Sequence, residues 1–292
     1  MTGIVLALVS SVLLASADAF KKHLAATVDS WVVIWLTLLG GVLVAALVHP
    51  FQVREVAITD PTTFWYFLGV SILASVAAEV AFMTALRSAE FSIVMPLCSL
   101  FPVAIALFGM AFLSEVPTIE ALIGIVIVVG GGCLLSIERD GEEKFQWRSI
   151  LSSQALRWMI VCSLCLATIV TTTKKAAPMI DSISFIGLIL GGSLVLFTVA
   201  LIAKRVPMIA MIRSAPLPAF SVALLWGLGY QLNFVANEFT LVAYVAAIGQ
   251  LSIAFAVFLG VVAFREQAQP FKLLVSGAMI VGALMIVLAE RA

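Results

Sequence analysis

The segment FWYFLGVSILASVAAEVAFMTAL, residues 64–86, decides the class of this protein. Glu79 is its one acidic residue, and it contains no basic residue. A helix needs about twenty apolar residues to cross the hydrocarbon core of a bilayer, so the segment predicts a transmembrane helix. The whole chain extends this pattern, because 63% of its 292 residues are hydrophobic and 11% are charged. A soluble domain has roughly a quarter charged residues, so the surface of this protein must face lipid.

Nine further apolar segments flank this one, and turn-forming sequences such as His49-Pro50 and Gln269-Pro270 separate them. The ten predicted spans are residues 3–20, 31–48, 64–86, 91–113, 119–137, 156–173, 185–203, 219–236, 241–264 and 271–288. The first lacks a basic leader and an Ala-x-Ala cleavage site, so we interpret it as a span and not as a removed signal peptide. The sequence predicts an all-α, multi-pass membrane protein of the cell membrane.

The two halves of the chain repeat. Lys21-Lys22 precedes Asp29-Ser30, and Lys174-Lys175 precedes Asp181-Ser182 in the same way. Glu115 and Glu266 end matching segments at an offset of 151 residues. We therefore expect two five-helix repeats, residues 1–140 and 154–292, joined by a polar linker, 141–153. An odd number of spans per repeat inserts the two with opposite orientations, and such inverted repeats are the basis of alternating access.

Several motifs resemble those of a known family. They are the basic residue that ends the first helix of each half, Ala85-Leu86-Arg87-Ser88-Ala89, Pro102-Val103 and Leu113-Ser114-Glu115. With these motifs the chain resembles the EamA-type ten-helix members of the drug/metabolite transporter superfamily. The resemblance implies metabolite export and cytosolic termini. The chain departs from the pattern at Ala15-Ser16, where Trp-Gly is usual, and at Ile253, where the second half has no counterpart of Pro102.

Basic residues inside the spans are the first candidates for a substrate site. Lys22 and Lys175 represent the two lysine pairs, and if they face a central cavity they would favour a carboxylate or a phosphate. The alternative is that these lysines extend to the lipid headgroups at the helix ends. Acidic residues inside spans are costly, so Glu79 and Asp18 are candidates for proton coupling. Asp18 could equally pair with Lys21 or Lys22, and Glu79 could be a protonated group that hydrogen-bonds to a neighbouring helix.

The densest polar and aromatic cluster lies in the eighth predicted span. It comprises Trp226, Tyr230, Gln231 and Asn233, and a midplane pocket needs such groups among apolar walls. Hydrogen bonding between helices is the alternative. Glu115 and Glu266 are interpreted as structural, pairing with a basic residue or capping the next helix. Small residues such as Gly124 and Gly282 allow close helix packing, either within the monomer or in a homodimer.

Other classes of function find little support. Cys162 and Cys165 lie on an apolar helix without a second pair, so we expect no metal site and no cofactor. Sixteen basic and sixteen acidic residues cancel, which argues against nucleic acid as a partner. We expect no enzymatic activity, since no nucleophile with a base is evident. A lipid-modifying membrane enzyme and a scaffold stay as remote alternatives.

The sequence thus predicts a secondary transporter of a small polar metabolite, such as an amino acid or an organic acid. Alternating access, proton coupling and export are parts of this hypothesis, and a phosphorylated or lipid-linked anion is the alternative cargo. Two indications of the orientation in the membrane disagree. Outside the motif lysines, all basic residues except Arg54 and Arg291 lie on the side opposite the termini. The positive-inside rule then places the termini outside the cytosol, against the resemblance.

Overall fold

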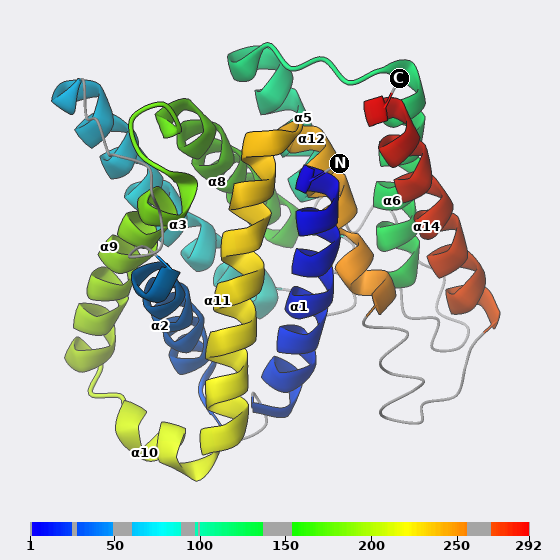
Figure 1. The fold of residues 1–292 in the computed structure, drawn as a ribbon. Coiled ribbons are helices and arrows are strands. Elements are labelled where there is room, and N and C mark those ends of the chain that lie inside the picture. The colour runs from blue at the N-terminus through cyan, green and yellow to red at the C-terminus, as the bar shows by residue number, and fades with distance from the viewer. Residues whose placement is uncertain are drawn as a thin grey trace. The chain divides into compact units, whose positions relative to one another are not determined.

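The computed structural model describes residues 2–24, 28–48, 60–88, 97–98, 100–136, 154–255 and 270–291. Every regular element in these ranges is a helix (Figure 1). The helices are α1 (Thr2–Leu24), α2 (Ser30–Val48), α3 (Pro61–Ser88), α5 (Leu100–Leu113), α6 (Ile119–Ser136), α8 (Gln154–Ala176), α9 (Ser182–Ala203), α10 (Met208–Ser214), α11 (Pro216–Phe239), α12 (Val242–Gly249) and α14 (Pro270–Arg291). The predicted linker, 141–153, lies outside the described residues.

The helices have the length and composition of membrane spans. In the described residues, α2, α3, α8, α9 and α11 each contain an apolar stretch long enough to cross a bilayer, and five shorter apolar helices accompany them. Each of the ten predicted spans overlaps one of these ten helices. The prediction of an all-helical membrane protein is therefore confirmed.

The chain forms two compact units that each draw on both halves of the sequence. The first, called here the α2 unit, comprises Thr2–Val76 and Thr172–Phe239. The second, called the α6 unit, comprises Ala77–Thr171 and Thr240–Ala292. The helices α3 and α8 each contribute residues to both units.

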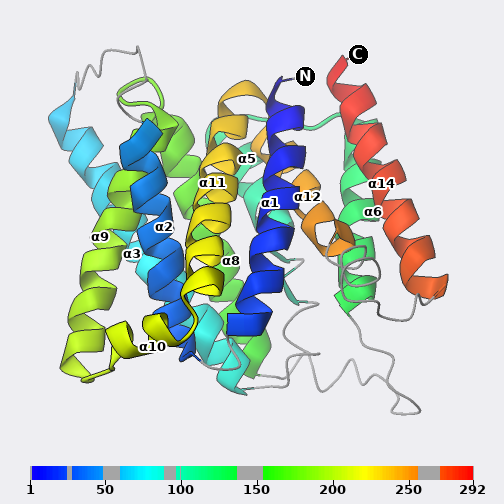
Figure 2. The ribbon, with the colours of Figure 1, turned by 60° about the horizontal axis from the view of Figure 1, so that its bottom comes forward.

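In the α2 unit, α11 packs along both α1 and α2, and α2 also packs along α9 (Figures 1 and 2). Glycine permits the closest approach. A Cβ atom on Gly227 would lie 2.6 Å from the backbone oxygen of Gly40, and one on Gly40 would overlap the backbone oxygen of Ala223. The helices α2 and α9 are antiparallel, since Trp31 at the start of α2 contacts Phe197 near the end of α9, with ring centroids 5.7 Å apart.

One short helix of the α2 unit was not predicted. The sequence between Arg205 and Pro216 suggested only a connection, but it contains α10. Met208, Met211 and Ile212 pack against a buried cluster formed by α1, α2 and α11. The helix thus depends on tertiary contacts, which a local sequence pattern does not show.

In the α6 unit, α6 packs along α14, and α12 packs against α5 (Figure 1). Gly124 and Gly282 meet across the first pair, because a Cβ atom on either would lie within 3.0 Å of the other's backbone oxygen. Gly130 and Gly277 face open space. The end of α3 packs against α8 through Ala78, Ala81 and Cys162.

Candidate functional site

Three aromatic rings form a column along one face of α11. Trp226, Tyr230 and Phe234 follow one another at intervals of four residues, the spacing that aligns side chains on one helix face. The rings of Trp226 and Tyr230 are stacked, with centroids 4.4 Å apart and planes 14° apart. The Phe234 ring continues the column, 4.9 Å from Tyr230. Two of the predicted site residues, Trp226 and Tyr230, are therefore in direct contact.

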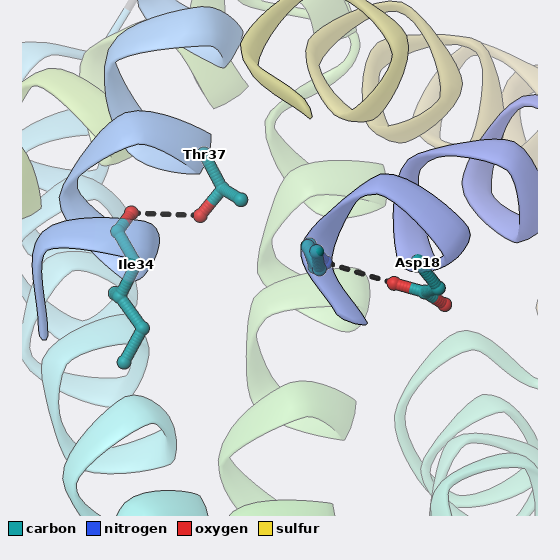
Figure 3. Close-up of polar contacts among 4 residues, drawn as sticks. Asp18, Ile34 and Thr37 are labelled. Atoms are coloured by element: carbon teal, nitrogen blue, oxygen red, sulfur yellow. Dashed lines mark hydrogen bonds and ion pairs between the residues drawn. The ribbon is translucent and has the colours of Figure 1, made fainter. Parts of the chain in front are cut away.

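A lysine of α1 faces this column. The Lys21 ammonium lies 5.7 Å from the centre of the Trp226 ring, within the range of a cation–π interaction. It also forms an ion pair of 3.0 Å with Asp18, whose carboxylate Figure 3 shows. The side chain of Lys21 is 28% exposed and that of Asp18 is 57% exposed. The ion pair with Asp18 that the sequence left open is present, although an exposed pair of this kind contributes little.

Lys22 is the predicted site residue of this lysine pair, and its side chain lies outside the described residues. A pattern in α1 could have favoured Lys21. Six residues at spacings of three and four form the stripe that faces α11: Ala7, Ser10, Leu14, Ala17, Lys21 and Leu24. Ala7, Ser10, Ala17 and Leu24 are fully buried. The hydroxyl of Ser10 donates to the backbone oxygen of Gly229 at 2.8 Å, which fixes α1 against α11.

Gln231 on α11 has a side-chain oxygen that accepts no hydrogen bond in the described structure. Its side chain is 3% exposed, and Nε2 donates to the backbone oxygen of Gly41 on α2 at 3.2 Å. Within the described structure Oε1 is buried and has no hydrogen-bond partner. Leaving a buried polar atom unpaired costs about 1–3 kcal/mol, so this oxygen is suited to a donor from a bound molecule. Asn233 is half-buried, and its backbone oxygen accepts from Asn237.

The second lysine pair lies elsewhere in the α2 unit. Lys174 and Lys175 occupy the last turn of α8, where Lys174 is half-buried and Lys175 is exposed. That turn leads into the start of α9, whereas α1 ends beside the start of α2. Because α2 and α9 are antiparallel, Lys21 and Lys175 belong to opposite ends of this unit. The structure therefore does not bring the two predicted lysines together.

The predicted proton-coupling residues occupy different surroundings. Glu79 is a half-buried residue of the α6 unit, next to Ala78, which packs against Cys162 of α8. Asp18 belongs to the α2 unit and is paired with Lys21. In the part of the chain that the structure describes, no three His, Cys, Asp or Glu side chains are arranged to hold a metal ion.

Glu115 caps a helix. Capping is one of the two structural roles predicted for it, and pairing with a basic residue is the other. Its Oε2 accepts from the backbone N–H of Val242 at 2.8 Å, at the start of α12. The helix that it caps here is α12, whereas at the start of α6, the next helix in sequence, Thr118 accepts from the backbone N–H of Ala121. Val242, whose N–H Glu115 accepts, belongs to the other half of the chain, so the sequence around Glu115 does not indicate this contact. Glu266 lies outside the described residues.

Comparisons with known proteins agree with this architecture. The model of the EamA-like transporter family matches residues 1–137. A Sinorhizobium sp. protein described as an uncharacterized transporter in the cobO 3′ region is 34% identical over 77 residues, which are 26% of this chain and 55% of that protein. An uncharacterized protein of Methanocaldococcus jannaschii is 31% identical over 107 residues, 37% of this chain and 74% of that protein.

A solved structure, titled only as the crystal structure of a protein, matches the whole fold. Its TM-score is 0.78 over 99% of this chain and 98% of that one, at 14% sequence identity. This likeness shows the fold alone. The helical spans, the family match over residues 1–137 and the relative described as a transporter point to the same conclusion: the chain belongs to the EamA-like transporter family, and its described helices are those of a multi-pass membrane protein.

Proposed function

We propose that the protein is a secondary carrier of a small polar metabolite that bears a carboxylate, such as an amino acid or an organic acid. The observation that carries this proposal is the Lys21 ammonium over the Trp226 ring, which stacks on the ring of Tyr230. The cation provides attraction for a carboxylate, and the rings provide an apolar wall. A metabolite site requires this combination of few polar groups and apolar surface.

An anionic cargo can compete with Asp18 for the ammonium of Lys21. The Lys21–Asp18 pair is exposed, so the attraction between its charges is weakened by solvent. A substrate carboxylate that enters a drier environment gains more from the same ammonium. The free acceptor of Gln231 suits an N–H donor, which an amino acid provides and a simple organic acid lacks.

Alternating access is proposed from the pairing of the helices. The five helices of the first half correspond in order to five helices of the second half, namely α1 to α8, α2 to α9, α3 to α11, α5 to α12 and α6 to α14. A two-fold exchange of the halves then converts the α1–α11 contact into the α8–α3 contact. The same exchange maps the α2–α9, α5–α12 and α6–α14 pairs onto themselves. All of these contacts occur within one unit or the other. This pattern supports two inverted five-helix repeats, which provide two equivalent access states.

The exchange also relates the two lysine pairs. Lys21 corresponds to Lys174, and both side chains are half-buried. Because the pairs lie toward opposite ends of the α2 unit, we propose that the two access states expose cargo to different pairs. Lys22, Lys175 and Asn233 are then accessory residues along the path.

Proton coupling through Glu79 or Asp18 is a further part of the proposal. A carboxyl group that binds a proton in one access state and releases it in the other drives transport against a gradient. In proteoliposomes, an imposed pH gradient should accelerate flux of the wild type. In the Glu79→Gln variant or the Asp18→Asn variant this acceleration should be lost while exchange at equal pH persists. Acceleration that survives both substitutions would exclude both residues.

The central test is flux in proteoliposomes with labelled amino acids, organic acids and phosphorylated metabolites. Replacing Lys21 by Met should reduce carboxylate flux at least tenfold, because the site then lacks its cation. Lys204→Met is the matched control, since Lys204 lies 4.5 Å from the Trp31 ring in an equivalent cation–π contact away from the column. Wild-type flux in the Lys21→Met variant would refute the site. Uptake confined to phosphorylated compounds would support the alternative cargo.

A further inference from the structure

We infer that one end of the α2 unit is a binding surface for the headgroups of anionic phospholipids. This surface, called here the α10 surface, comprises the end of α9, the helix α10 and the start of α11. In Figures 1 and 2, α10 lies across the ends of α9 and α11 and not along them. A helix in that position has the geometry of an interfacial helix.

The α10 surface is basic. Lys204, Arg205 and Arg213 are all exposed, and the sequence contains no acidic residue between Asp181 and Glu238. Asp29 lies two residues before Trp31, whose ring the Lys204 ammonium faces. Its carboxylate accepts from the backbone N–H of Trp31 at 2.8 Å, where it caps α2. The basic side chains therefore have an excess of positive charge that a phosphate group would neutralise.

The surface is also apolar on the side that would face lipid. Ile209, Leu217 and Phe220 are 68%, 71% and 65% exposed. On the inner side of α10, Met208, Met211 and Ile212 pack against the buried cluster of α1, α2 and α11. The outer apolar residues thus remain available to acyl chains, while the basic ones remain available to headgroups. A soluble anion would use the charges and leave the apolar residues exposed to water.

The backbone holds two of the charges in place. The turn after α9 has Arg205 in the left-handed conformation, with φ of 55°. The N–H of Val206 donates to the oxygen of Leu201 at 3.1 Å, and that of Arg205 to the oxygen of Ile202 at 2.9 Å. This pair of bonds is a Schellman motif, which ends the helix and fixes the chain direction.

The neighbouring tryptophan indicates the depth of the α10 surface. The Lys204 ammonium lies 4.5 Å from the Trp31 ring, which also contacts Phe197. Tryptophan in membrane proteins prefers the level of the headgroups. The ammonium therefore lies where lipid phosphates are found, and the occupant that fits both charge and apolar side chains is an anionic phospholipid.

The test measures lipid binding by the detergent-purified full chain. Native mass spectrometry would count bound phosphatidylglycerol and phosphatidylcholine at equal concentrations, with inorganic phosphate as a separate probe. A basic residue near an anionic surface contributes about fivefold, so the Lys204→Gln, Arg205→Gln, Arg213→Gln triple variant should lose roughly a hundredfold in preference for phosphatidylglycerol. The charge-conserving triple Lys204→Arg, Arg205→Lys, Arg213→Lys should keep it.

Two results would overturn the inference. The first is equal binding of the two lipids by the wild type, which would show that the charges do not select a headgroup. The second is an unchanged preference in the glutamine triple variant, which would place the lipid site elsewhere. If inorganic phosphate displaces phosphatidylglycerol completely at equal concentration, the site binds a soluble anion and the lipid assignment is also wrong.

Discussion

The carboxylate of Glu115 accepts a hydrogen bond of 2.8 Å from the backbone N–H of Val242. The two residues come from different halves of the chain, and both lie in the α6 unit. Leu241, the N-cap residue of α12, has an apolar side chain and forms no capping bond. Glu115, which follows the end of α5, therefore supplies the cap that the local sequence of α12 lacks. A carboxylate at this position also interacts favourably with the helix dipole.

Removing this cap should destabilise the protein without removing the substrate site. Glu115→Ala is expected to lower the free energy of unfolding by about 1–2 kcal/mol, because the N–H of Val242 loses its acceptor. Glu115→Gln keeps an oxygen and should lose less. Glu120→Ala, an exposed acidic residue in the first turn of α6, is the control. Thermal unfolding in detergent measures the effect, and an unchanged midpoint in Glu115→Ala would show that the cap is dispensable.

The contact between α2 and α11 should be intolerant of a methyl group. A Cβ atom on Gly227 would lie 2.6 Å from the oxygen of Gly40, which belongs to the backbone and cannot rotate away. Gly227→Ala must separate the helices, and overpacking of this kind costs about 1–3 kcal/mol. Gly191→Ala on α9 is the matched control, since a Cβ atom there would meet nothing within 4 Å. Its lower backbone entropy when unfolded should make it neutral or stabilising.

The Gly227→Ala and Gly191→Ala variants also test whether the α2–α11 contact affects transport. Trp226 lies one residue before Gly227, and a separated α2–α11 contact would move the aromatic column. We therefore expect Gly227→Ala to reduce flux in proportion to its loss of thermal stability. An equally stable Gly227→Ala protein would contradict the assigned backbone contact.

The spans were predictable because their signal is local. Each consists of a long apolar run, and apolar composition alone favours the membrane. The helix α10 was missed for the opposite reason. It has only seven residues and is held by Met208, Met211 and Ile212 against a cluster from three other helices.

The site was partly predictable for a related reason. Trp226 and Tyr230 share one helix, so their spacing of four residues already places them on one face. The choice between Lys21 and Lys22 depends on which face of α1 meets α11, and that is a property of the helix pair. The stripe from Ala7 to Leu24 contains this information, whereas the charge of a single lysine does not. The partner of Glu115 could not be found, because it lies in the other half of the chain.

Acid should weaken the start of α3. Asp60 accepts from the backbone N–H groups of Thr62 and Thr63, and Thr63 also donates its hydroxyl to it. The hydroxyl bond from Thr63 is the main cause that lowers the pKa of Asp60 below its usual value of 3.8. A lowered pKa contributes stability that is present above the unfolded value and is lost as the pH falls through the folded value.

The stabilising effect of Asp60 should therefore begin to decline near its unfolded pKa, at about pH 4, and should be lost as the pH falls through the lower folded value. Asp60→Ser keeps an N-cap side chain that does not titrate in this range. The unfolding temperature of the wild type should fall relative to that of Asp60→Ser as the pH is lowered from 7 to 3. Thr63→Val should reduce the difference, because the principal hydrogen bond is lost. A constant difference between the wild type and Asp60→Ser across this range would show that Asp60 does not contribute through its charge.

The orientation of the chain follows from the exposed basic residues of the α10 surface. Lys204, Arg205 and Arg213 lie at the end of the α2 unit where α1 ends and α2 begins. By the positive-inside rule this end should face the cytosol, which places the first residue of α1 on the other side. Ser214 on α10 and Thr62 at the start of α3 are exposed at opposite ends of the α2 unit. In a variant whose four native cysteines are replaced, Thr62→Cys should react with a membrane-impermeant thiol reagent in intact cells. Ser214→Cys should react only after permeabilisation, and the reverse pattern would place the start of α1 in the cytosol, as the family resemblance implies.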